Sequence, residues 1–347
     1  MIKQLSEQLM TKVSKLEETS GLYMTTYDKQ VEESNLTLEQ IQYGGYIFEK
    51  NTNKVVCANI PRIQTINCFD DIPGGLSDVE MEYCEDGTIV RLYNFNGTWF
   101  TATNRCLNAK ESYWTANKSF NEMFFEVFDE SLVCHLDTSF TYVFVLLHKD
   151  NRIVIKHATN HLVYLGRLLN TFDEQCLERE SIERDILGIK GPEVIVPNVG
   201  MTVEELYKSS KRGIIIRKQM KSYKIDFQKY KEYKYVRGNC ARIDLRVIEL
   251  IQESSYMLDM FKNVFPEHSM EAERILSKLD ELVMTIYRLY VDSHIKHLVS
   301  VNEESKYYRT LKQLHAQYKT TGVAISYDAV KQKVYSLSKF VIYNMIK

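Results

Sequence analysis

Basic and aromatic residues alternate along one stretch of the chain, residues 208–237. Eleven lysines and arginines stand there against two acidic residues, and four tyrosines lie among them. Lysine and arginine neutralise phosphate groups and tyrosine rings stack on bases, so this composition is typical of contact with nucleic acid or polyphosphate. A pair of strands with a lysine-rich solvent face is the alternative. The candidate nucleic-acid contacts are Lys218, Lys221, Lys229, Lys231, Lys234 and Arg237.

Charge is unevenly distributed along the chain, although the formal net charge is only -2. The first 86 residues carry fifteen acidic against seven basic residues, and residues 296–347 carry nine basic against three acidic ones. The second basic excess supports the same expectation of phosphate contact. Opposite charges in the two regions would also suit docking within a larger assembly.

Cysteines and histidines do not form a disulfide or metal-binding pattern. The seven cysteines are an odd number, widely spread, without a C-x-x-C pair. We therefore expect reduced thiols and no zinc site. His148, His157 and His161 are expected on different strands or turns, with no carboxylate at ligand spacing, so they too predict no metal site.

The elements that must position these residues fall into two regions. Between residues 43 and 237, short apolar or alternating runs separated by turns such as Asp86-Gly87 predict antiparallel strands, among them RIVIKHA at 152–158. Helices are expected there only over 119–129 and near 203–209. After Gly238, apolar residues recur at helical spacing. The sequence thus predicts an α+β domain over residues 1–240 and an all-helical domain over residues 241–347.

Composition is that of a folded globular protein. The 347 residues are 44% hydrophobic and 26% charged, which is enough to bury a sizeable core. No stretch approaches the length of a membrane span, and the first 20 residues predict an amphipathic helix and not a secretory signal. We therefore expect an intracellular protein with no membrane partner.

Five segments follow one another in an order that resembles the motifs of covalent nucleotidyltransferases. They read EYCEDGTIVRLYNF, SFNEMFFEVF, TYVFVLLHKDNRIVI, RGIIIR and SYKIDF. This region is similar to ATP-dependent RNA ligases of the T4 RNA ligase 1 type, and especially to their relatives in phages and large DNA viruses. The resemblance implies nucleotidyltransferase-like antiparallel sheets around a cleft, and a helical C-terminal domain used in tRNA recognition.

Four positions depart from what the chemistry of these ligases needs. In them a lysine in a K-x-D-G loop attacks the α-phosphate of ATP, glutamates on later strands serve the metal and the lysine, and two lysines neutralise phosphate charge. Here Cys84 stands at the nucleophile position, Val145 and Arg212 stand at the glutamates, and Asp226 stands at the second lysine. Gly44-Gly45 also lacks the arginine expected before its strand. The departures imply that adenylylation is lost, with no catalytic residue and no bound metal.

Other matched positions keep residues that suit a phosphate group. A pocket with more cations and fewer carboxylates favours bound phosphate without metal, so no cofactor is required and ATP is a candidate ligand. Turn formation alone would also explain Asp86-Gly87 and Asn151-Arg152. The candidate nucleotide or phosphate contacts are Asp86, Gly87, Arg105, Arg152, Arg212 and Lys224.

The sequence and the resemblance together predict a catalytically degenerate RNA-ligase-like protein that binds RNA or nucleotide, or acts as a scaffold, in viral RNA metabolism. RNA, with tRNA as one candidate, is the expected partner, and a protein partner is the second. The first alternative is an active ATP-dependent RNA ligase whose nucleophile is Lys110, Lys118 or Lys221. The second is a structural subunit of a larger assembly. The expected location is the cytoplasm of a virus-infected cell.

Overall fold

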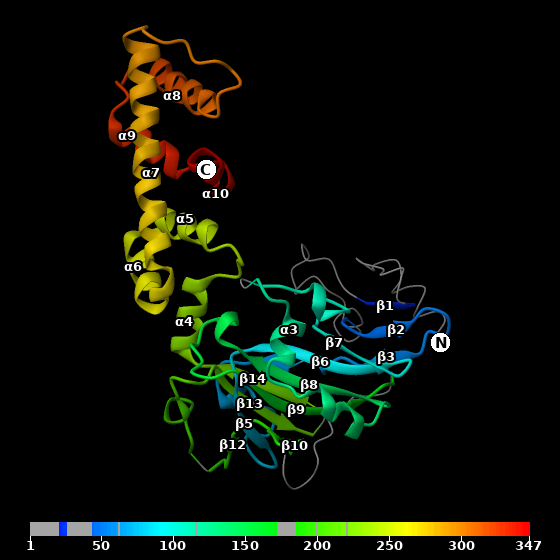
Figure 1. Cartoon of the computed structure of the whole chain (residues 1–347). Helices are drawn as coiled ribbons and strands as arrows, with labels where there is room; N and C mark the ends of the chain where they lie inside the picture. Colours follow the sequence, from blue (N-terminus) through cyan, green and yellow to red (C-terminus); the bar gives the residue numbers. More distant parts are fainter. Residues whose placement is uncertain are drawn as a thin grey trace. The chain divides into compact units, whose positions relative to one another are not determined.

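The computed structural model describes residues 21–25, 44–61, 63–114, 117–171, 185–198, 200–219 and 221–347. Its contacts divide the chain into two compact units, Met1–Lys231 and Glu232–Lys347. In Figure 1 the first unit is coloured from blue to green and the second from yellow-green to red. The helix expected over the first 20 residues lies outside the described residues. The division into a 1–240 and a 241–347 domain stays a prediction about independent folding.

A four-stranded antiparallel sheet of the first unit is buried on both faces. Its strands lie in the order β7 (Thr98–Ala102), β6 (Thr88–Phe95), β8 (Phe140–Leu147) and β9 (His161–Leu169). Side chains alternate along β8, so Phe144 packs with Phe124 of helix α3 (Phe120–Phe125), whereas Val145 packs in a second cluster with Phe48. Burial of both faces explains the nearly continuous apolar sequence of β8.

Two small sheets accompany it. Strands β1 (Leu22–Met24), β2 (Ile47–Glu49) and β3 (Val55–Cys57) form an antiparallel sheet whose apolar side chains cover the second face of the four-stranded sheet. Strands β10 (Asp185–Ile186) and β11 (Ile189–Lys190) form a hairpin. Leu187 and Gly188 at its turn both have positive φ, which is the conformation of a two-residue hairpin loop.

A five-stranded sheet carries most of the residues that the resemblance singled out. Its order is β12 (Val194–Ile195), β5 (Glu80–Cys84), β13 (Gly213–Lys218), β14 (Lys221–Asp226) and β4 (Ile63–Thr65). All neighbours are antiparallel except β14 and β4, which are parallel. The predicted α+β class with antiparallel sheets is therefore confirmed, with one parallel pair.

Three local predictions in the first unit need correction. The helix over 119–129 starts as expected, because Ser119 and Glu122 form a reciprocal cap, but α3 ends at Phe125 and a 3-10 turn over Glu130–His135 follows. The helix near 203–209 is a single 3-10 turn, Glu204–Leu206. The RIVIKHA segment at 152–158 contains no strand, because its backbone N–H groups at residues 154 and 155 bind a side chain and not a neighbouring strand.

The basic stretch 208–237 contains a strand pair in its first part and a helix in its second part. Strands β13 and β14 form a hairpin, but the lysine-rich continuation is helix α4 (Gln228–Arg237). Of its tyrosines, Tyr223 and Tyr230 are buried and Tyr235 is exposed. The four tyrosines therefore cannot all stack on bases in this conformation. The alternative of a strand pair fits residues 213–226 but not the helical residues 228–237.

The second unit is helical, as expected. After the end of α4 its helices are α5 (Ile243–Glu253), α6 (Ser255–Val264), α7 (Ser269–Tyr290), α8 (Tyr308–Thr321), α9 (Tyr327–Tyr335) and α10 (Lys339–Ile346), with a π-helical turn over Val291–Ile295. Residues at the predicted apolar spacing, such as Leu250, Phe261 and Leu279, are fully buried in one cluster. No helix in the described part of the chain is long and apolar enough to cross a membrane.

Candidate functional site

Three strand ends bring the matched motif positions together in the first unit. Cys84 ends β5, Gly213 begins β13 and Asp226 ends β14, and the register pairs Gly213 with both of the others. A Cβ atom on Gly213 would lie 2.0 Å from the carbonyl oxygen of Ile225. Glycine at this position therefore allows the close approach that places Cys84 and Asp226 on either side of one residue.

Arg212 and Asp226 form a mostly buried ion pair at this edge. Arg212 Nε donates to Asp226 Oδ1 at 2.7 Å and a terminal nitrogen lies 3.3 Å from Oδ2, while Lys224 Nζ lies 3.6 Å from Oδ2. Burial alone would lower the pKa of Arg212, but the bond to Asp226 and neighbouring groups raise it. The guanidinium is thus neutralised within the protein, so a phosphate at Arg212 would compete with Asp226.

Asp86 is the buried hydrogen-bonding centre of the site. It is 1% exposed, and its Oδ2 accepts from the backbone N–H groups of Val154 and Ile155 at 2.9 and 2.8 Å. Its Oδ1 accepts from the Tyr230 hydroxyl at 2.6 Å. Burial, and then the Asp86 carboxylate, raise the pKa of Tyr230. Both carboxylate oxygens are therefore occupied, and they join the turn after β5 to the 152–155 segment and to α4.

Gly87 and Val145 lie directly against each other. A Cβ atom on Gly87 would lie 2.6 Å from Val145 Cγ1 and 2.5 Å from the carbonyl oxygen of Leu146. Val145 is 6% exposed and belongs to the apolar cluster with Phe48. The position that the resemblance matches to a metal-site glutamate therefore lies next to the loop of Cys84, as part of an apolar wall.

Cys84 is poorly suited to nucleophilic attack. Its side chain is buried at 8% exposure, and burial raises the pKa of the thiol to about 11. With this pKa the thiol is protonated at neutral pH. Because the thiolate is the reactive form, the protonated thiol is unreactive. Among the described residues, no group of three His, Cys, Asp or Glu side chains is placed to hold a metal ion.

The other predicted phosphate contacts occupy different surroundings. Arg152 Nε donates to the Val154 carbonyl at 3.0 Å, which places Arg152 beside the segment that Asp86 binds. Arg105 is exposed in the turn that follows β7. The role of Arg105 in phosphate binding stays a prediction.

The predicted nucleic-acid contacts separate into two groups and one buried residue. Lys218 and Lys221 face each other in register at the ends of β13 and β14, and Lys218 Nζ donates to the carbonyl oxygens of Gly74 and Gly75. Arg237 is 3% exposed and donates to the Cys240 carbonyl at 2.8 Å. The remaining cations lie on α4, where two are exposed and one is half-buried: Lys229, Lys234 and Lys231.

Lys118, one of the lysines considered as a displaced nucleophile, is not prepared for attack. Lys118 pairs with Glu126 at 2.6 Å and Asp150 at 3.4 Å, and these carboxylates raise the pKa of Lys118, chiefly through the hydrogen bond to Glu126. A nucleophilic lysine needs a lowered pKa. Lys110 and Lys221 are exposed to solvent.

The sequence-based prediction did not include several residues of the site. Tyr230 reaches Asp86, Lys211 pairs with Glu85, and Arg217 donates to the buried Glu82 at 2.9 Å. The partners in each pair are more than 100 residues apart in sequence. The only available signal was the short distance in sequence of each residue from a matched motif.

Comparisons with known proteins give two similar relatives. No protein-family model matches the chain. It is 23% identical over 266 residues to an immediate-early protein ICP-46 homolog of Invertebrate iridescent virus 6, covering 67% of this chain and 57% of the relative. It is 27% identical over 234 residues to an immediate-early protein ICP-46 homolog of Invertebrate iridescent virus 3, covering 62% and 50%. The chain thus spans about half the length of the curated relatives it matches.

Similar solved structures are ligases. Two forms of an archaeal ATP-dependent RNA ligase have TM-scores of 0.45 and 0.44 at 12% and 11% identity. The first covers 80% of this chain and 75% of its own, and the other covers 95% and 93%. A putative ATP-dependent DNA ligase from Aquifex aeolicus has a TM-score of 0.45 at 11% identity, covering 92% of this chain and 80% of its own.

Proposed function

We propose that this chain is a ligase-like binding protein that holds RNA or a nucleotide and does not form a protein–AMP intermediate. The buried, protonated Cys84 at the nucleophile position is the observation that carries the proposal. Val145 in an apolar wall and the Arg212–Asp226 pair support it, because the groups that would bind metal or stabilise phosphate charge are replaced or neutralised. ATP is a candidate ligand and not a required cofactor.

The proposed setting is RNA metabolism in virus-infected cells, with the cytoplasm as the location. The names of the two relatives describe immediate-early proteins of invertebrate iridescent viruses, which supports action in infected cells. RNA, tRNA included, is the proposed partner, and a protein partner is the second candidate. The basic hairpin and α4 support RNA contact through phosphate groups.

Intact-mass measurement after incubation with ATP and Mg²⁺ or Mn²⁺ tests the loss of adenylylation. We expect no species heavier by one AMP, with nucleotide binding followed by calorimetry on the same sample. An AMP adduct would overturn the proposal in favour of an active ligase. Peptide mapping would then locate the nucleophile among Lys110, Lys118 and Lys221, and also Lys211 and Lys224, which lie near Cys84.

Salt-dependent binding of a labelled single-stranded RNA tests the RNA partner. Each phosphate neutralised contributes about -0.7 to the slope of log affinity against log salt. Replacing Lys229, Lys231 and Lys234 together by Gln is expected to make the slope shallower by roughly 1 to 2. The matched control replaces three exposed lysines elsewhere by Gln: Lys54, Lys149 and Lys190. A flat salt response in the unmodified chain would instead support the alternative of a structural subunit.

A further inference from the structure

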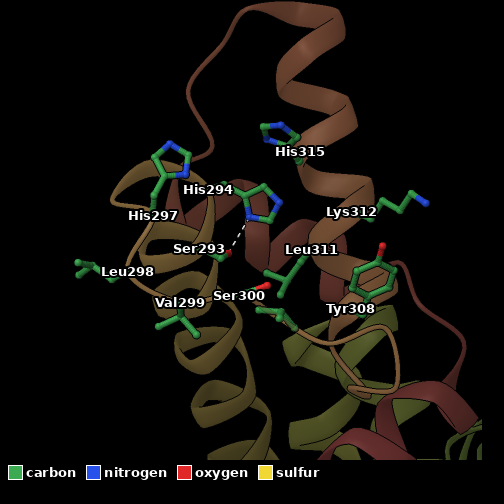
Figure 2. Close-up of a pocket in the computed structure, with 11 residues that line it drawn as sticks. Ser293, His294, His297, Leu298, Val299, Ser300, Tyr308, Leu311, Lys312 and His315 are labelled. Atoms are coloured by element: carbon green, nitrogen blue, oxygen red, sulfur yellow. Dashed lines mark hydrogen bonds between the residues drawn. The ribbon is translucent and has the colours of Figure 1, made fainter.

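A cavity of about 480 Å³ lies in the second unit, and none of its lining residues is among the candidate contacts described above. It is formed by the π-helical turn after α7, the loop that follows this turn, and α8 (Figure 2). On α8 the lining residues Tyr308, Leu311, Lys312 and His315 recur at three- and four-residue spacing, so they share one helix face. The cavity therefore has two helical walls and a loop rim.

The polar lining of this cavity is basic or neutral. Among the described residues, no aspartate or glutamate lines it. The adjoining segments carry three acidic side chains, of which Asp292 and Glu303 have their own partners and Glu304 is exposed. Asp292 pairs with Lys296 at 3.3 Å, and Glu303 accepts the Tyr308 hydroxyl at 2.9 Å. A site with cations, imidazoles and hydroxyls but no lining carboxylate suits an anion. Its polar lining residues are Ser293, His294, His297, Ser300, Tyr308, Lys312 and His315.

The rings of two lining histidines are in contact, tilted by 42° to one another. The ring centroids of His294 and His315 are 4.5 Å apart, and Tyr290 stacks on His294 at 5.1 Å. Figure 2 shows these two rings between the π-helical turn and α8. Nδ1 of His315 is buried and has no hydrogen-bond partner in the described structure. A buried nitrogen without a protein partner is rare, so this atom is available for a hydrogen bond with a ligand.

The hydrogen bonds of Ser293 fix which nitrogen of His294 carries the proton. The single hydroxyl proton of Ser293 is donated to the Leu289 carbonyl at 2.5 Å, so the 2.7 Å contact with His294 must be a bond donated by Nδ1–H. Neutral His294 then has an unprotonated Nε2. To donate a hydrogen bond to an anion through Nε2, His294 must take up a proton.

The backbone around these histidines departs from regular helix. A π-helical turn over Val291–Ile295 carries Ser293 and His294, and such turns are frequent at functional sites. His297 has φ of 54°, in the left-handed region that residues other than glycine seldom adopt. The chain thus keeps two unusual conformations at the residues that line the cavity.

The protein groups around His294 oppose a positive charge on its ring. Burial lowers the pKa of His294, and His315, His297 and Lys319 lower it further. Lys312 is the lysine that lines the cavity, and the hydroxyl group of the lining Tyr308 donates a hydrogen bond to Glu303. A bound anion would offset this repulsion and favour the protonated ring.

We propose that this cavity binds a phosphate group, with Lys312, His315 and protonated His294 as its contacts, and that binding takes up one proton at His294. A metal site is disfavoured because no group of three ligating side chains is assembled among the described residues and Nδ1 of His294 is already used. The inference does not depend on the proposed function, because every lining residue belongs to the second unit.

Titration of the full-length chain by NMR tests the proposal through the histidine ring signals. Sulfate serves as the first probe because its charge is constant between about pH 5 and pH 9, so any pH dependence comes from the protein. Binding is expected to weaken up to tenfold per pH unit above the pKa of His294, if one proton is taken up. Inorganic phosphate and AMP are then compared with adenosine, to separate a free phosphate from one carried by a nucleotide.

Matched variants locate the effect. His294→Gln is expected to remove the pH dependence, and Lys312→Gln is expected to weaken binding roughly tenfold at every pH. His135→Gln, an exposed histidine of the first unit, is the control and is expected to change neither. Equal binding of AMP and adenosine, no binding of any anion, or the same loss in the control would overturn the proposal.

Discussion

Arg212 and Asp226 illustrate how two apparent losses in a sequence can be one interaction. Taken separately, each residue reverses the charge expected at its position. In the structure the two side chains bind one another through two contacts, at 2.7 and 3.3 Å. The two side chains therefore neutralise one another, and Arg212 is not a free cation for phosphate.

A double-mutant cycle measures this pair. Arg212→Asp or Asp226→Arg alone places like charges together in a mostly buried site, and each is expected to lower the free energy of unfolding by about 3 kcal/mol. The combined exchange should recover at least about 1 kcal/mol. Urea unfolding is the measurement. The same exchange at the exposed pair Lys208 and Glu193 should cost no more than about 1 kcal/mol. Strict additivity at 212 and 226 would show that the pair is not coupled.

The Cys84 thiol gives a pH-dependent prediction. Its pKa of about 11 in the folded chain exceeds the 9.0 of an ordinary thiol, so the folded state favours the protonated form. The associated stability is present below about pH 9 and is lost as the pH rises toward 11. Near pH 7.5, alkylation of exposed Cys68 and Cys134 should be at least about tenfold faster than that of Cys84. Equally fast labelling of Cys84 would restore it as a candidate nucleophile.

At the scale of elements, the close approach of the paired strands β13 and β14 depends on Gly213. Gly213→Ala would place Cβ 2.0 Å from a backbone oxygen, so it is expected to destabilise the chain by roughly 3 kcal/mol or more. Gly97→Ala is the control, since Gly97 has φ of 80° with open space around it and should cost about 1 kcal/mol. Thermal unfolding followed by circular dichroism compares the two. Similar losses would argue against close strand approach.

Most elements could be predicted from sequence because their periodicity follows local burial. The strands β5 to β9 and the helices after residue 240 have one or two buried faces that set the spacing of apolar residues. Helix α4 was missed because lysine and tyrosine alternate in it, whereas its buried residues Tyr230 and Arg237 are seven positions apart, which is about two helical turns. RIVIKHA reads as a strand, yet Asp86 binds its N–H groups, and a partner so far away in sequence leaves no local signal.

The candidate site was predictable as a set of positions but not as a set of interactions. The order of motifs indicated Cys84, Asp86, Gly87, Val145 and Asp226, and the structure brings these around shared strand ends and one turn. Which charge meets which depends on side-chain directions that no spacing in the sequence encodes. The pocket around His294 had no sequence signal, because its histidines belong to separate segments.

At the scale of the whole molecule, the contacts made by the end of α4 determine where a stable fragment of the helical unit must begin. Val236 is 1% exposed in the helical core, and Arg246 donates to the carbonyls of Val236 and Tyr235 at 3.1 and 2.8 Å. A fragment of residues 232–347 should therefore unfold cooperatively and be roughly 2 kcal/mol or more stable than one of residues 241–347, which lacks these contacts. Urea unfolding by circular dichroism compares them, with Lys234→Gln in the longer fragment as an exposed control. Equal stability would place the domain boundary near 240.

The ion pair at the end of β14 limits how its two positions can change. A single substitution toward the residue of the ligases that the sequence resembles, Arg212→Glu or Asp226→Lys, would create two neighbouring carboxylates or two neighbouring cations where an ion pair now stands. Either single variant is expected to be less stable than the present chain. The two positions are therefore expected to vary together, as a coupled pair, among natural sequences that keep this strand end.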